Sequence, residues 1–204
     1  EFSRQYAVTE LEKKFQNDII HNILNGKIHS MGELQKNTSL LGVDINGSYR
    51  VIVFGMTNES MARGDFKAKV KDIDVLSDLI RSRISKAKIH NDLDKIVVIQ
   101  EVEREQTQEE YRKNIKKIAE QVQADVARYN KYLKIKAGAG RVVDGIINLP
   151  ESFKEANEAF MFVDVAGETP EDGGPQIMLF ADLGIFKLLC QLSDPSMLLE
   201  YVPE

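Results

Sequence analysis

Two aspartates, separated by one residue, lie just before a run of β-branched residues. They are Asp92 and Asp94 in the stretch "HNDLDKIVVI", residues 90–99. Neighbouring carboxylates can hold a divalent cation, and such cations drive many phosphoryl-transfer reactions. Aspartates are also common in turns, where they accept hydrogen bonds from the nearby backbone. From residue types alone, a solvated turn between two strands is the favoured interpretation, and a remnant nucleotide or small-ligand site is the alternative.

The second candidate is the glycine-rich stretch "AGAGR", residues 137–141. It could be mistaken for a phosphate-binding loop, but it lacks both the G-x-G-x-x-G spacing and a following Lys-Ser/Thr pair. We therefore expect its glycines to lie in a strand and to permit close packing. Arg141 ends the stretch, and a surface ion pair is a more common role for such an arginine than binding an anion.

The histidines and the cysteine do not predict a metal site or a redox site. The histidines His21, His29 and His90 are far apart in sequence, without a cysteine or carboxylate at a metal-binding spacing. The single cysteine, Cys190, lies in the apolar stretch "LGIFKLLCQL", which is typical of a buried helix. It cannot form an internal disulfide, which fits a reducing compartment. We expect no metal site and no cofactor.

Composition limits the function classes further. The chain has 204 residues, 43% of them hydrophobic, and a formal net charge of −5. This length suits one main domain with an N-terminal appendage. Without a dense run of Lys or Arg, the chain is a poor nucleic-acid binder as it stands. It has no apolar run long enough to cross a membrane and no readable signal peptide, so we expect a cytoplasmic location.

Two helices are predicted in the first 45 residues. Apolar residues recur at helical spacing up to Gly26, and a shorter helix follows from about Ser30 to Gly42. We assign residues 1–45 to this helical hairpin. The apolar face of its first helix could pack on the main domain or pair with a partner. Packing is favoured, because the face is broader than a coiled-coil seam.

From Ser48 onward the pattern predicts the order β-α-β-β-α-β-α-β. Strands are expected at 48–56, 86–90, 95–102, 133–141 and 176–183, and helices at 70–84, 107–133, 152–165 and 183–192. Thr107 and Glu110 form a plausible capping box, and residues 167–176 form an acidic loop. The fold class is an α/β sandwich, with helices against a mainly antiparallel central sheet. We place this domain at 46–192 and the start of a linker at 193–204.

Three segments, taken in order, resemble a single protein family. They are "IIHNILNGKI" with the following "GELQKNTSLLGVDINGSYRVIVF", then "AGAGRVVDGIINLPESFKEANEAF", and last "MLFADLGIFKLLCQLSDPSMLLEYV". Their order and distances are similar to those of the GGDEF-like domain in transcriptional regulators of the PucR/CdaR type, which govern purine and sugar-diacid catabolism. The resemblance covers about residues 11–203 and implies a nucleotidyl-cyclase-like fold.

The resemblance also implies that catalysis has been lost. Active diguanylate cyclases of this fold carry Gly-Gly-Asp/Glu-Glu-Phe in the central hairpin, where glycines approach GTP and acids hold divalent metals. The corresponding residues here are Asp92, Leu93, Asp94, Lys95 and Ile96. Only Asp94 keeps its acid, and Lys95 reverses a charge. The end of the first strand, in "VIVFGMTNES", offers no second acid.

The implied function is a non-catalytic, effector-responsive module of a transcriptional regulator, serving as spacer, relay or dimerisation surface. Family members continue into a C-terminal helix-turn-helix, so DNA would be bound only by a part beyond residue 204. The alternative is a small-molecule or nucleotide sensor, for which Asp94 and Arg141 are the candidate ligand-binding residues. A divergent nucleotide cyclase is the weakest of the three candidates. Self-association is expected, and contact with a membrane is not.

Overall fold

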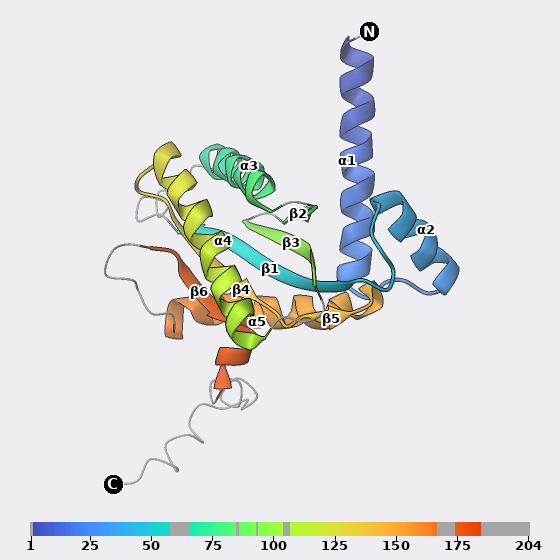
Figure 1. Ribbon diagram of the computed structural model, residues 1–204. Helices are drawn as coiled ribbons and strands as arrows, with labels where there is room; N and C mark the ends of the chain where they lie inside the picture. The colour runs from blue at the N-terminus through green and yellow to red at the C-terminus, as the bar shows by residue number, and fades with distance from the viewer. Residues whose placement is uncertain are drawn as a thin grey trace, which may run out of the picture.

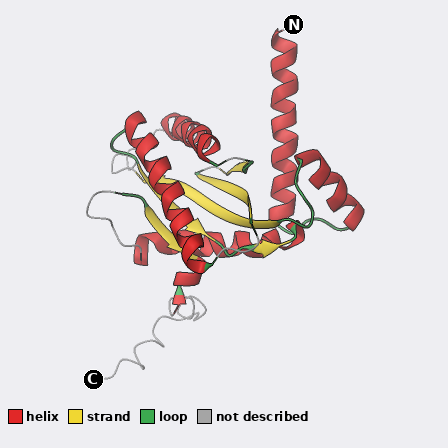
Figure 2. Ribbon diagram, viewed as in Figure 1, coloured by secondary structure: helices red, strands yellow, loops and turns green. Residues whose placement is uncertain are grey.

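The fold is a single sheet with helices on both faces. The computed structural model describes residues 2–57, 66–84, 86–92, 94–103, 107–166 and 174–184. Within these residues, the strands follow the order β2-β3-β1-β4-β6, and the short β5 pairs with one end of β1. Helices α1, α2 and α5 share a core with one face of the sheet, and α3 and α4 share a core with the other. Figures 1 and 2 show the strands between these helices.

The strands confirm the expected α/β sandwich with a mainly antiparallel sheet. They are β1 (Ser48–Thr57), β2 (Lys88–Asp92), β3 (Lys95–Val102), β4 (Lys134–Ala139), β5 (Val143–Asp144) and β6 (Gln176–Leu179). Among the strands that the structure describes, only β4 and β6 pair in parallel. The last strand is shorter than predicted, because the chain turns into a 3-10 helix, η3, at Phe180–Asp182.

The helices begin and end near the residues that the capping signals indicate. They are α1 (Phe2–Leu24), α2 (Met31–Leu41), α3 (Phe66–Arg83), α4 (Gln108–Tyr129) and α5 (Leu149–Ala166), with a 3-10 helix, η2, at Ile146–Asn148. Ser30 caps α2, Gly42 ends it in a left-handed conformation, and the predicted capping box starts α4. The prediction that α4 reaches Leu133 was wrong. Asn130 has an extended backbone and ends the helix. Its backbone N–H donates to the carbonyl oxygen of Val126.

Helix α1 is anchored to the domain at one end only. Its last turns bury Ile19, Ile20 and Ile23, which pack in the same core as the sheet. Leu11 and Phe15, on the preceding turns, are 67% and 54% exposed. Figure 1 shows this part of the helix projecting away from the sheet. The predicted apolar face therefore packs on the domain along the C-terminal end of the helix, and Leu11 and Phe15 lie outside this contact.

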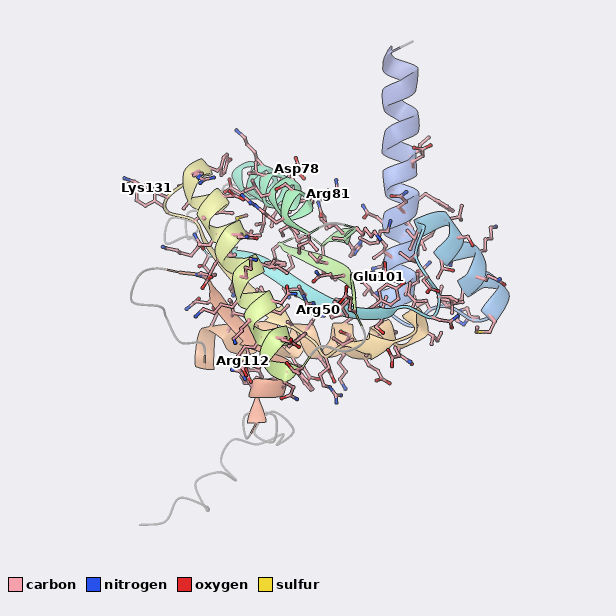
Figure 3. All side chains as sticks on the ribbon, in the orientation of Figure 1. Arg50, Asp78, Arg81, Glu101, Arg112 and Lys131 are labelled. Atoms are coloured by element: carbon pink, nitrogen blue, oxygen red, sulfur yellow. The ribbon has the colours of Figure 1, made fainter. Side chains whose placement is uncertain are left out.

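An arginine lies inside the core between the sheet and α4. Arg50, on β1, is fully buried and donates from Nε and Nη2 to the amide oxygen of Gln100, at 2.9 and 2.7 Å (Figure 3). Its guanidinium lies 5.0 Å from the ring centroid of Tyr111, and Nη1 has no hydrogen-bond partner among the described residues. Burial lowers the pKa of Arg50 to about 10. Arg50 is not among the residues for which the sequence pattern predicts a role.

Some predictions lie outside the described residues. These are the helix at 183–192 with Cys190, the linker at 193–204, and most of the acidic loop at 167–176. Among the described helices, none combines the length and the apolar content needed to cross a membrane.

Candidate functional site

The residues at the signature position form the predicted hairpin between β2 and β3. Asp92 pairs with Lys95 and Asn91 with Ile96, so two residues connect the strands. Ile96 is fully buried, whereas Asp92 and Asp94 are exposed at the tip. Leu93 lies outside the described residues. The hairpin prediction is confirmed, and it leaves both carboxylates near solvent.

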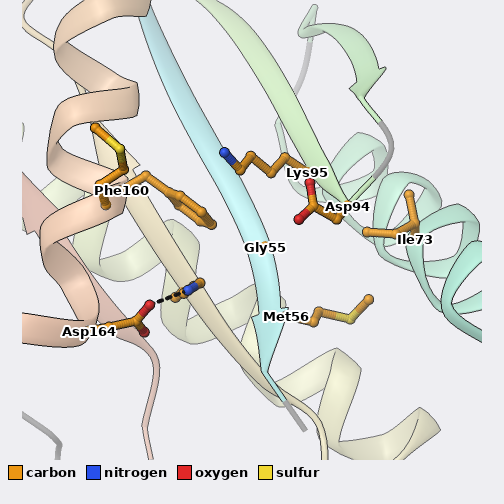
Figure 4. A pocket seen from close by; sticks show the side chains of 9 residues that line it. Gly55, Met56, Ile73, Asp94, Lys95, Phe160 and Asp164 are labelled. Carbon is orange, nitrogen blue, oxygen red and sulfur yellow. Dashed lines mark hydrogen bonds and ion pairs between the residues drawn. The ribbon is translucent and has the colours of Figure 1, made fainter. Parts of the chain in front are cut away.

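The hairpin borders a cavity of about 370 Å³. Its walls come from β1, α3, the hairpin, β4 and α5, and its lining residues are Gly55, Met56, Ile73, Asp94, Lys95, Lys136, Phe160, Met161 and Asp164. Figure 4 shows the Phe160 ring opposite the hairpin residues Asp94 and Lys95, with the β1 strand between them. Of the predicted site residues, Asp94 and Lys95 therefore line a common cavity.

Two lysines flank the aromatic ring in this cavity. The Nζ atom of Lys95 lies 5.2 Å from the Phe160 ring centroid, and that of Lys136 lies 4.9 Å from it. Such cation–π contacts are attractive. Lys136 also forms an ion pair with Asp164 at 2.6 Å, drawn as a dashed line in Figure 4. The cavity thus presents ammonium groups over an aromatic ring, with carboxylates at its rim.

The comparison with known families agrees with this arrangement. The sequence model of the GGDEF-like domain matches residues 25–161, about two thirds of the chain. The chain belongs to the GGDEF-like domain family. The matched region runs from the end of α1 to α5 and so contains the hairpin and most of the cavity. No curated protein sequence matches this chain.

The cavity of this GGDEF-like domain does not fit a divalent metal. Gly55 on β1 pairs directly with Lys95 on β3, so neither strand offers a carboxylate at this point. A Cβ atom on Gly55 would lie 2.6 Å from the Phe160 ring, so the ring occupies the space of any side chain there. The Lys95 ammonium would also repel a dication. Among the described residues, no group of three or more His, Cys, Asp or Glu could hold a metal ion.

The glycines of "AGAGR" have the expected packing role in the GGDEF-like domain. A Cβ atom on Gly138 would lie 2.2 Å from the backbone nitrogen of Phe160, and one on Gly140 would lie 2.0 Å from the backbone oxygen of Ser152. Both glycines therefore let β4 and the residue after it press against α5. The prediction of close-packing glycines is confirmed.

Arg141 lies apart from the cavity and pairs with a buried carboxylate. Its Nε atom donates to Glu155 of α5 at 2.7 Å, and its backbone N–H donates to the same carboxylate at 2.9 Å. Glu155 is only 7% exposed. Arg141 is not among the residues that line the hairpin cavity. Its contacts fit the surface ion pair that the sequence favoured.

A pair of histidines joins α1 to the edge of the sheet. The ring centroids of His21 and His90 are 5.6 Å apart, and the Nδ1 atom of His90 is buried without a hydrogen-bond partner among the described residues. Burial, and then the nearby His21, lower the pKa of His90, although Asp92 and Asp18 act in the opposite direction. The histidines were expected not to form a metal site, and their spacing in the sequence does not predict that two of them meet.

Acidification should destabilise the domain through His90. Because its pKa is lower in the folded state than the ordinary value of 6.5, the unfolded chain takes up this proton more readily. The contribution of His90 to the free energy of unfolding is complete above pH 6.5. It is lost as the pH falls through the pKa that His90 has in the folded state. Thermal unfolding between pH 7.5 and 5.5 should therefore show a smaller drop in midpoint for His90→Gln than for the wild type.

The exposed His29 supplies the matched control. His29→Gln should leave the pH dependence of the unfolding midpoint as it is in the wild type. If the two substitutions change that dependence equally, the histidine pair has no special part in the acid response.

Proposed function

We propose that this GGDEF-like domain is a non-catalytic regulatory module of a bacterial transcriptional regulator of the PucR/CdaR type. The observation that carries the proposal is the pairing of Gly55 with Lys95 under the Phe160 ring, at the place where a cyclase needs acids for its metals. Phosphoryl transfer depends on metals that bridge the phosphate oxygens, and the protein supplies little other chemistry. A cavity that disfavours those metals supports a regulatory role.

Nucleotide turnover tests the proposal directly. The purified protein, incubated with GTP or ATP and with Mg²⁺ or Mn²⁺, should form no cyclic or dinucleotide product. A Gly55→Asp/Lys95→Glu variant should stay inactive as well, because the Phe160 ring still fills the space beside residue 55. Product formation by the wild type that Asp94→Ala abolishes would overturn the proposal in favour of a divergent cyclase.

On this proposal, the whole protein acts on DNA through a helix-turn-helix that follows residue 204. The net charge of −5 fits a module that does not itself bind nucleic acid. The full reading frame is the decisive observation. A helix-turn-helix within roughly one small domain's length, about 100 residues, would support the regulator, and its absence would count against it.

Self-association belongs to the same proposal. Leu11 and Phe15 are exposed apolar side chains one helical turn apart on the projecting part of α1, and exposed apolar patches often mark interaction sites. Sedimentation of the 204-residue chain over a range of micromolar concentrations should show a dimer. A strict monomer at high micromolar concentration would exclude this part of the proposal.

A second candidate function, ligand sensing, is favoured by the cavity beside the hairpin. An aromatic ring with two ammonium groups suits a planar or anionic molecule such as a purine metabolite, a sugar acid or a nucleotide. Any ligand that binds the folded state raises its stability. A thermal-shift screen of these classes should find one stabilising compound whose effect is reduced by Asp94→Ala. Arg141→Ala should leave this stabilisation unchanged if the compound binds in the hairpin cavity. It should reduce the stabilisation if the compound binds near Glu155, which Arg141 contacts.

A further inference from the structure

The outer edge of β2 forms the floor of a groove of about 780 Å³. Helices α1 and α3 form its walls, and Ala87, Lys88, Ile89 and Asn91 line its floor. β2 is the last strand at this side of the sheet, and within the described part of the chain it pairs only with β3. Its outer row of backbone groups therefore has no strand partner there. Such an edge is a template for a strand from another chain.

We propose that a second copy of this chain pairs with this edge, β2 against β2 in antiparallel register, so that two sheets become one. The inference rests on the proposed self-association and names its surface. The sequence of β2 is self-complementary in this register. With the two-fold axis at His90, Lys88 faces Asp92 of the second copy and Asp92 faces its Lys88. Opposite charges facing each other across antiparallel strands stabilise the pairing.

The two charges of this register are available for a partner. Neither Lys88 nor Asp92 forms an ion pair with another described residue. Because side chains alternate along a strand, Lys88, His90 and Asp92 share the face that His90 turns toward His21 of α1. Within β2, a register shifted by two residues would place Lys88 or Asp92 opposite His90, so only the proposed register pairs both charges of the strand with each other.

The charged residues of helix α3 would also be complementary under this two-fold axis. Asp74, Asp78 and Arg81 are exposed, lie on one face of the helix, and line the groove. Figure 3 shows Asp78 and Arg81 on the outer side of α3. A two-fold axis through the β2 edge sets the α3 helices of two copies antiparallel. The acidic end of one then lies toward the basic end of the other.

The projecting part of α1 completes the surface. In Figure 1, α1 extends past β2 on the open side of the sheet. A second copy seated on the β2 edge would therefore lie beside Lys14, Gln16 and Asn17, the polar residues of α1 that line the groove. This wall of the groove would become part of the contact between the two copies.

Charge reversal and exchange test the register. Sedimentation equilibrium of the 204-residue chain should show that Lys88→Asp or Asp92→Lys weakens dimerisation by about tenfold, because each change places like charges at both symmetric positions. The double variant Lys88→Asp/Asp92→Lys should restore the wild-type affinity. Lys131→Asp, at the exposed turn after α4, is the matched control and should have no effect. Thermal unfolding of each variant establishes that it folds.

A cross-link gives an independent readout. In a chain carrying Cys190→Ser, His90→Cys should form a disulfide-linked dimer on mild oxidation. Directly opposed antiparallel residues have Cα atoms about 4.5–5.5 Å apart, within the range that a disulfide spans. Tyr132→Cys, 65% exposed and remote from β2, should not cross-link at low micromolar concentration.

Each other outcome overturns the inference. A dimer that neither single reversal weakens would show that another surface carries the association, and the proposed self-association would stand. Single reversals that weaken the dimer without rescue by the double variant would exclude this register. A wild-type protein that stays monomeric would overturn both the inference and the proposed self-association.

Discussion

Gly138→Ala is expected to destabilise the domain by about 3 kcal/mol, the upper end of the usual range for overpacking. The added Cβ atom would lie 2.2 Å from the backbone nitrogen of Phe160 and 2.5 Å from the backbone oxygen of Ala156. Both are main-chain atoms of α5, so no side chain can turn away to make room. The helix itself would have to move off β4. Urea unfolding should show a lower midpoint with an unchanged slope.

Gly32→Ala is the matched control for this substitution. Gly32 lies in α2, and a Cβ atom there would meet nothing within 4 Å. Alanine favours helix over glycine by up to about 1 kcal/mol, so this variant should be neutral or more stable. If both alanines change the free energy of unfolding equally, β4 and α5 are not in the close contact described.

Phe160→Ala should have the second large effect, a loss of about 3–5 kcal/mol in the free energy of unfolding. Phe160 is 5% exposed, packs in the core formed by α1, α5 and the sheet, and covers Gly55. Its removal leaves a void next to an existing cavity and takes away the aromatic face that Lys95 and Lys136 contact. Chemical denaturation followed by circular dichroism measures this loss.

The adjacent Met161 provides the comparison. It is 61% exposed, so Met161→Ala should change the free energy of unfolding by no more than about 0.5 kcal/mol. Phe160→Leu, which keeps most of the apolar volume, should fall between the two alanine variants. A Phe160→Ala variant as stable as Met161→Ala would contradict the packing of this ring against the sheet.

The sequence predicts the elements of this fold because their signals are local. The capping box at Thr107 and the glycine at residue 42 fix helix ends within a few residues of chain. The β2–β3 hairpin follows from a short polar turn between two β-branched segments. The order of the strands within the sheet was not predicted, because it depends on pairing between residues far apart in the sequence.

The contacts around the cavity and around Arg50 join residues far apart in the sequence, and local sequence patterns do not predict them. Phe160 reads as an ordinary apolar residue of an amphipathic helix, and only the fold places it over Gly55 and beside Lys95. Arg50 stands among apolar strand residues, and its acceptor Gln100 is 50 residues away. A polar residue inside a hydrophobic strand was the one signal that could have pointed to that buried pair.

The two-residue connection of the hairpin limits how this part of the gene can evolve. Strand side chains alternate between faces, so inserting or deleting one residue between Asp92 and Lys95 would turn Ile96 and Val98 from the core shared with α3 and α4 to the opposite face of the sheet, or shift their pairing with β1. Substitutions at the exposed tip carry no such penalty. Natural variation at this exposed tip should therefore change the residue types and keep the number of residues.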